Sequence, residues 1–130
     1  MIVLDASVLI GYLDGDDAHH HGAEALLAAA VDDEFGANPL TLTEVLVVPA
    51  RDGRLEAVMG VLRDLEIAEL AFPPDTASRL ALLRVATGLK MPDCCVLLSA
   101  EATNATVASF DNRLLRAAED RGRPVSTEMT

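Results

Sequence analysis

The chain has 130 residues, enough for one domain with a buried core, and 51% of them are apolar while only 3% are aromatic. The formal charge of −11, from 21 acidic and 10 basic residues, argues against a protein that coats duplex nucleic acid with a basic face. It does not exclude a nuclease, because acidic side chains around a divalent cation reverse the local field.

Short strands and helices alternate in the first half of the chain. Residues 2–4 predict an apolar strand, and the helix that follows is ended by Asp14-Gly15. Apolar spacing then predicts, in chain order, helices over residues 6–13 and 19–33, a strand over 34–40, and helices over 41–53 and 54–65.

The second half continues this alternation. Its elements are a strand over residues 67–72, helices over 76–88 and 91–104, a strand over 105–111, a helix over 112–122 and a short strand over 124–127. Gly88 and Gly122 are natural helix ends, and Pro92 suits the first turn of a helix.

Strands separated by helices predict βαβ units and a largely parallel sheet. We therefore expect a single domain over residues 1–130, an α/β fold in which a three-layer α/β/α sandwich surrounds a mostly parallel central sheet of four to five strands. No apolar run approaches the ~20 residues that span a bilayer and no leader is evident, so we expect a cytoplasmic protein without a membrane partner.

Four acidic residues stand at or near the ends of predicted strands, where ligands bind in open α/β sheets. Asp5 ends the first strand and Asp111 ends the strand over 105–111. Glu44 and Asp93 lie in the predicted first turns of the helices over 41–53 and 91–104. They are far apart in sequence, so only the fold can gather them.

Each acid also has a purely structural interpretation. Asp5 and Asp111 suit helix N-caps, and Asp93 suits the positive end of a helix dipole. Glu44 completes the capping-box pattern T-x-x-E that begins at Thr41. Taken singly, the sequence leaves both interpretations open for every one of them.

Four segments taken together carry a family resemblance. They are LDAS with Asp5 and Ser7, LTLTEVL with Glu44, MPDCCVLLSAEA with Asp93, and VASFDNRL with Ser109 and Asp111. In order and spacing, over essentially the whole chain, they resemble the PIN-domain family and, within it, the VapC-type toxin ribonucleases of toxin–antitoxin pairs. Two departures are mild: Cys94-Cys95 stand at positions more often held by Ala or other small residues, and Ser109 stands where Thr is common.

The resemblance implies an endoribonuclease that depends on Mg²⁺ or Mn²⁺ and uses Asp5, Glu44, Asp93 and Asp111 as catalytic, metal-holding carboxylates. Hard oxygen ligands suit these ions, whereas thiolate or imidazole clusters suit zinc. Asp5 and Asp93 are expected to bind the metal directly, and the other two directly or through water. Ser7 and Ser109 are expected to hydrogen-bond the carboxylates or a metal-bound water.

Further expectations concern partners. Lys90, Arg113 and Arg116 are candidates for RNA binding, although an ordinary solvated surface is the more common role for any one of them. The resemblance also implies a cognate VapB-type antitoxin, whose arginine could pair with the carboxylates, and a homodimer built on apolar helix faces around VLIGYL or EVLVV. The consecutive histidines at 19–21 diverge on a helix, so we expect them to form surface rather than a site.

Two other functions remain open from the sequence. One is a non-catalytic interaction domain that keeps only the fold. The other is an Asp-based phosphotransfer or phosphatase domain, which also places an aspartate after a first strand, although DAS lacks the second aspartate of a D-x-D motif.

Overall fold

A sheet of five short strands forms the centre of the computed structural model, which describes residues 1–126. The strands are β1 (Ile2–Leu4), β2 (Phe35–Ala37), β3 (Ile67–Glu69), β4 (Thr106–Ala108) and β5 (Val125–Ser126). The helices within this range are α1 (Ala6–Leu13), α2 (His20–Ala29), α3 (Pro39–Arg51), α4 (Leu55–Asp64), α5 (Thr76–Thr87), α6 (Met91–Thr103) and α7 (Asn112–Asp120).

All strand pairs are parallel, and the strand order is β3-β2-β1-β4-β5. The central strand β1 pairs Val3 with Gly36 on one side and with Val107 on the other. The chain therefore builds the sheet outward from β1 in one direction and then returns to its other side. The carboxyl ends of β1 and β4 lie beside each other at this reversal, where open α/β sheets form ligand crevices.

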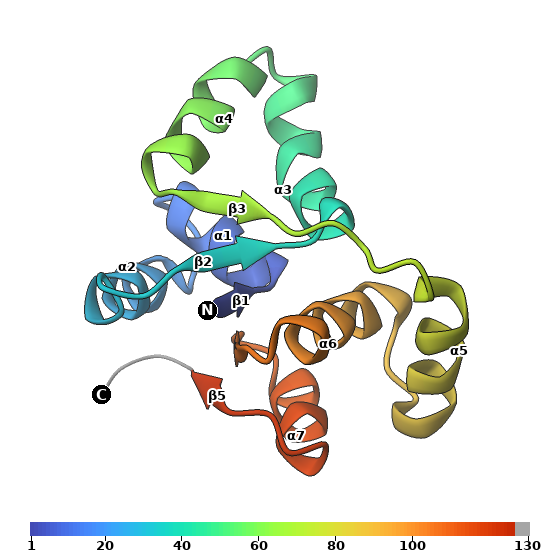
Figure 1. Cartoon of the computed structure of the whole chain (residues 1–130). Helices are drawn as coiled ribbons and strands as arrows, with labels where there is room; N and C mark the ends of the chain where they lie inside the picture. The colour runs from blue at the N-terminus through green and yellow to red at the C-terminus, as the bar shows by residue number, and fades with distance from the viewer. Residues whose placement is uncertain (127–130) are drawn as a thin grey trace.

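Helices cover both faces of the sheet, which confirms the predicted three-layer sandwich (Figure 1). Ile2 and Leu4 point to a core shared with α1, α2, α3 and α4, whereas Val3 points to a second core shared with α5, α6 and α7. Opposite directions for successive side chains follow from the two-residue period of a strand.

The start of α3 differs from the prediction. The helix begins at Pro39, because Asn38 accepts a hydrogen bond from the Thr41 amide (N···Oδ1 2.9 Å) and proline suits the first helical position. The expected start at residue 41 and the capping box from Thr41 to Glu44 are therefore wrong. Glu44 lies in the second turn of α3, not in the first.

Other helix ends follow their sequence signals. Gly88 and Asn104 adopt left-handed backbone conformations after α5 and α6, with φ of 69° and 53°. The strands are shorter than predicted, and α2 begins at His20 with His19 as its cap residue. The predicted last strand forms in part, as β5; its residue Thr127 lies outside the described residues.

Within residues 1–126, no helix combines the length and hydropathy needed to cross a bilayer.

Candidate active site

A hollow of about 180 Å³ opens at the carboxyl ends of β1 and β4. Its lining includes all four of the acidic residues singled out from the sequence, together with Ser7, Thr41 and Pro92; the four are Asp5, Glu44, Asp93 and Asp111. The fold thus brings together residues that the sequence separates by up to 106 positions, from Asp5 to Asp111.

Each acid reaches the hollow from a different helix terminus or helix face. Asp5 and Asp111 are the N-cap residues of α1 and α7, so their proposed capping role is real and coexists with their place in the hollow. Asp93 lies in the first turn of α6, and Glu44 on the exposed side of α3. Three helix N-termini therefore direct their positive ends toward the same cluster of carboxylates.

Asp5 is the most firmly held of the four. Its Oδ1 accepts hydrogen bonds from the Ser7 hydroxyl (2.7 Å) and the Val8 amide (3.2 Å), and its Oδ2 accepts one from the Ser109 hydroxyl (2.5 Å). The residue is only 5% exposed. Two serines, from α1 and from the segment after β4, thus fix its orientation.

The same two serines also hold the turn that leads to Asp111. The Phe110 amide donates to the Ser7 hydroxyl (3.1 Å), and the Asp111 amide donates to the Ser109 hydroxyl (2.9 Å). Ser7 and Ser109 therefore connect the end of β1 to the end of β4 through their side chains. Their expected contact with a carboxylate is present in the structure.

Burial raises the pKa of Asp5, and the serine and Val8 hydrogen bonds offset part of that rise because they favour the ionised form. Burial also raises the pKa of Asp93, and repulsion from Asp111 and Asp5 raises it further, while Lys90 acts in the opposite direction. Two crowded, partly desolvated carboxylates favour a cation or a proton in the hollow.

The donor set suits a hard divalent cation, since it consists of carboxylate and hydroxyl oxygens. An ionised carboxylate offers about four acceptor positions, and Asp5 uses three of them within the protein. Within residues 1–126, however, no three His, Cys, Asp or Glu side chains lie close enough together to coordinate one metal ion in their present conformations. Side-chain adjustment by Glu44, Asp93 or Asp111 is needed to complete one.

The remaining predicted residues lie around this hollow rather than in it. Lys90 is exposed and precedes α6, and its charge acts on Asp93. Arg113 and Arg116 are exposed on α7 and line a separate hollow. The three bases thus lie outside the lining of the acidic hollow.

The histidines do not enter the acidic hollow. His20 contacts the Gly11 carbonyl through Nδ1 (2.8 Å) and Glu24 through Nε2 (3.3 Å). His19 stacks on Phe110 with 4.5 Å between the ring centroids, a contact that the sequence did not indicate. Cys94 and Cys95 are buried free thiols, and burial raises the pKa of both.

Sequence reasoning also missed Asn38. This residue is fully buried and caps α3, and its Nδ2 has no hydrogen-bond partner among the described residues. The dipeptide Asn38-Pro39 carried the signal, because asparagine favours the N-cap and proline the next position.

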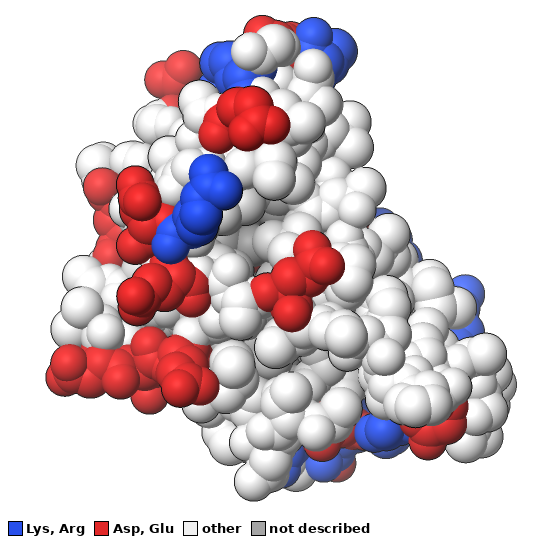
Figure 2. Space-filling view, turned by 45° about the horizontal axis from the view of Figure 1, so that its top comes forward, with Lys and Arg blue, Asp and Glu red and all other residues white. Residues whose placement is uncertain are grey.

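The surface charge is uneven. In Figure 2 acidic side chains gather on the left of the molecule, whereas most basic ones lie at its top and along its right and lower edges. On the face shown, an anionic ligand would meet more repulsion on the left than along the right edge.

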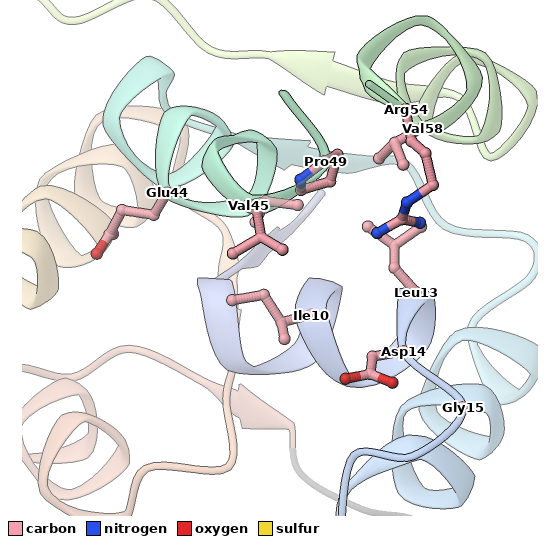
Figure 3. A pocket seen from close by; sticks show the side chains of 10 residues that line it. Ile10, Leu13, Asp14, Gly15, Glu44, Val45, Pro49, Arg54 and Val58 are labelled. Atoms are coloured by element: carbon pink, nitrogen blue, oxygen red, sulfur yellow. The ribbon is translucent and has the colours of Figure 1, made fainter. Parts of the chain in front are cut away.

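A second, largely apolar groove of about 320 Å³ shares Glu44 with the acidic hollow. It runs between α1 and the α3–α4 pair, where Figure 3 shows Ile10 facing Val45 and the Arg54 side chain reaching toward Leu13. Ile10 and Val48 are 38% and 47% exposed, so apolar surface is open to a partner here.

Comparison with known proteins identifies the fold. The family model of the PIN domain matches residues 2–120. No match was found among curated protein sequences.

Solved structures of three bacterial proteins are similar. A toxin–antitoxin complex from Klebsiella pneumoniae shares 19% identity over 85% of this chain and 87% of that one, with a TM-score of 0.71. VapC20 of Mycobacterium tuberculosis, described as a sarcin-ricin loop cleaving toxin, shares 16% identity over 90% of this chain and 95% of that one, with a TM-score of 0.73. VapBC2 of Rickettsia felis, bound to a promoter DNA fragment, shares 14% identity over 97% of this chain and 98% of that one, with a TM-score of 0.71.

Proposed function

Because the chain belongs to the PIN-domain family, we propose that it is the toxin of a toxin–antitoxin pair and a divalent-metal-dependent endoribonuclease. The observation that carries this proposal is the gathering of Asp5, Glu44, Asp93 and Asp111 around one hollow. Similar folds that are described as toxins or toxin–antitoxin complexes support the biological role.

Asp5 and Asp93 are proposed to hold Mg²⁺ or Mn²⁺ directly, with Glu44 and Asp111 acting directly or through water. Such an ion, when bound, lowers the pKa of a coordinated water and neutralises charge on the attacked phosphate. The raised pKa values of Asp5 and Asp93 fit this role, since a cation relieves the desolvation and repulsion that cause them.

The chain's own residues supply position and orientation. Ser7 and Ser109 hold the Asp5 carboxylate in place, and Ser109 also fixes the Asp111 amide. Asp111 caps α7 through the Arg113 and Leu114 amides, which keeps that acid at the rim of the hollow. This rigid side of the site would face the more exposed Glu44 on α3.

The test is an RNA cleavage assay on the chain purified free of any partner. We expect cleavage with Mg²⁺ or Mn²⁺, none with EDTA, and a loss of at least a hundredfold in Asp5→Asn and Asp93→Asn, with 5′-phosphate and 3′-hydroxyl ends. Asp64→Asn, a change at an exposed acid in α4, is the matched control. Equal cleavage by all variants, or 2′,3′-cyclic phosphate ends, would contradict the metal–acid mechanism.

The same assay separates the alternatives. A non-catalytic interaction domain would cleave no RNA under any metal condition. An Asp-based phosphotransfer domain would cleave no RNA and would form an acyl-phosphate at Asp5 on incubation with a phosphodonor.

The partner is proposed to be a VapB-type antitoxin segment that combines apolar side chains with an arginine. The apolar groove between α1 and α3–α4 would take the apolar side chains, and its end at Glu44 leads to the acidic hollow. An arginine there would pair with carboxylates through charge-assisted hydrogen bonds. Ile10→Asp should abolish antitoxin binding while leaving RNA cleavage by the free chain in place.

The homodimer stays a prediction. Of the two segments considered for its interface, VLIGYL is mainly core, since Val8 and Leu9 are fully buried. The segment EVLVV exposes Val47 and Val48, at 57% and 47%. Sedimentation analysis of the wild type and Val47→Glu would test whether α3 supplies the contact.

A further inference from the structure

The charge of this chain is divided along its length. Residues 1–75 hold 15 acidic and 3 basic residues, whereas residues 76–126 hold 5 acidic and 7 basic residues. The second part, which contains α5, α6 and α7, is therefore net positive in a protein of net charge −11. This contrast points to α5–α7 as the side of the molecule that an anionic polymer would approach.

A hollow of about 410 Å³ lies on this positive side, between the end of α5 and the outer face of α7. Three arginines contribute to its lining: Arg113, Arg116 and Arg121. Asp120 is its one acidic lining residue and stands toward the C-terminal end of α7. We call this hollow the arginine groove.

Two of the three arginines are free to bind a ligand. Arg121 forms a two-pronged ion pair with Glu101, with nitrogen–oxygen distances of 2.6 and 3.1 Å. Arg113 and Arg116 are exposed and form no ion pair with any acid in residues 1–126. They are three residues apart on α7, so they are neighbours on one helix face.

The opposite wall of the groove is held in place by the protein itself. It consists of Ala86, Thr87 and Leu89, at the end of α5. The Arg84 guanidinium donates hydrogen bonds to the Gly88 carbonyl (2.6 Å) and the Leu89 carbonyl (2.8 Å), which fixes this turn.

Both walls of the arginine groove are neighbours in sequence of residues that line the acidic hollow. On α7, Arg113 lies two residues after Asp111, a rise of about 3 Å along a helix axis. On the other wall, Leu89 is followed by Lys90 and then by Pro92 and Asp93, which line the acidic hollow. The groove and the carboxylate cluster are therefore linked through two short stretches of chain, residues 111–113 and 89–93.

We propose that the arginine groove binds the backbone of single-stranded RNA on one side of the scissile phosphate, with Arg113 and Arg116 as its phosphate contacts. This inference rests on the proposed ribonuclease function and assigns a path to its substrate. Arginine forms paired hydrogen bonds with phosphate, and the short sequence distance between the groove and the acidic hollow would let one strand reach both.

Salt dependence of RNA binding tests the path. Binding of a fluorescein-labelled single-stranded RNA is measured by anisotropy between about 50 and 200 mM salt, in EDTA and in the Asp93→Asn background, where no cleavage interferes. The groove variant is Arg113→Gln/Arg116→Gln. The matched control is Arg51→Gln/Arg63→Gln, which removes the same charge from exposed arginines of α3 and α4 that line neither hollow.

Each phosphate contact on a single strand contributes about −0.7 to the slope of log affinity against log salt, so the groove variant should lose about 1.4 from it. The control pair should keep its slope, and Arg113→Lys/Arg116→Lys should recover it. Equal slopes in all proteins would overturn the proposal. Equal losses in the groove and control pairs would also overturn it, because overall charge alone would then explain binding.

Cleavage assays in Mn²⁺, in the native Asp93 background, separate this proposal from the ribonuclease proposal. A groove variant that cleaves RNA with unchanged kcat/KM at every salt concentration would overturn the groove and leave the ribonuclease standing. A wild type that binds RNA through the groove but never cleaves it would support the groove and refute the ribonuclease.

Discussion

Ser109→Ala is the sharpest test of how this site is held together. The Ser109 side chain is fully buried, donates a hydrogen bond to Asp5 and accepts one from the Asp111 amide. A hydrogen bond to a charged group contributes about 1.5–3 kcal/mol and a neutral one about 0.5–1.5 kcal/mol. Loss of both should lower the free energy of unfolding at pH 7 by about 2–4.5 kcal/mol.

The pH dependence identifies the cause of this loss. The folded-state pKa of Asp5 is raised above its ordinary value, so the folded protein takes up a proton before the unfolded chain does as pH falls. The contribution of Asp5 to the free energy of unfolding therefore becomes more favourable as pH falls through the raised pKa. The Ser109 hydroxyl favours the ionised form, so its removal costs most at neutral pH and least once Asp5 is protonated.

The assay is urea unfolding of wild type and Ser109→Ala in EDTA at pH 7 and at about pH 4, near the ordinary carboxyl pKa. The control is Ser99→Ala, which removes a buried hydroxyl on α6 that forms no hydrogen bond to the acids within residues 1–126. A loss below about 1 kcal/mol, a loss equal at both pH values, or a loss matched by Ser99→Ala would refute the reasoning.

Three further predictions concern the site and the core. Asp93→Asn should raise the free energy of unfolding of the metal-free protein at pH 7, because the native carboxylate is partly desolvated and repelled by Asp111, and this gain should disappear in acid. In thermal unfolding, Mg²⁺ at 100 times its Kd should stabilise the wild type by about 2.7 kcal/mol but should not stabilise this variant. Leu114→Ala, in the core beneath α7, should cost about 2–5 kcal/mol in urea unfolding, whereas the 71% exposed Leu82→Ala should change stability by no more than about 0.5 kcal/mol. Gly36→Ala would place its Cβ 2.7 Å from the Leu70 side chain, which should lower the free energy of unfolding by about 1–3 kcal/mol. The loss in the double variant Gly36→Ala/Leu70→Ala should be smaller than the sum of the losses in the two single variants. Full additivity would contradict the clash.

Local signals in the sequence predicted the elements well because each depends on a few neighbouring residues. Gly88 and Asn104 ended their helices, and apolar runs marked each strand of the sheet. The error at α3 has the same local origin. Thr41 and Glu44 match a capping box, but Asn38-Pro39 offers a stronger start three residues earlier.

Non-local features were beyond the reach of pattern reasoning. The order of strands, the Ser109 contact to Asp5 and the stacking of His19 on Phe110 all join segments far apart in the chain. The gathering of the acids was expected only through a family resemblance, because each acid alone suits a helix cap as well. Arg113 and Arg116 were named as RNA-binding candidates, but the groove itself was not predicted, because its opposite wall comes from the turn after α5.

The Ser109–Asp5 contact affects the order in which the chain can fold during synthesis on the ribosome. It spans 104 residues of sequence, and it joins the first strand to the fourth. A nascent chain that has reached α6 already carries three of the four acids, yet it has no second wall for their hollow. The cluster is completed only when β4 pairs with β1, a late step because closing so long a loop carries an entropic cost. Synthesis thus delays assembly of the acidic site until the segment carrying Ser109 and Asp111 has emerged.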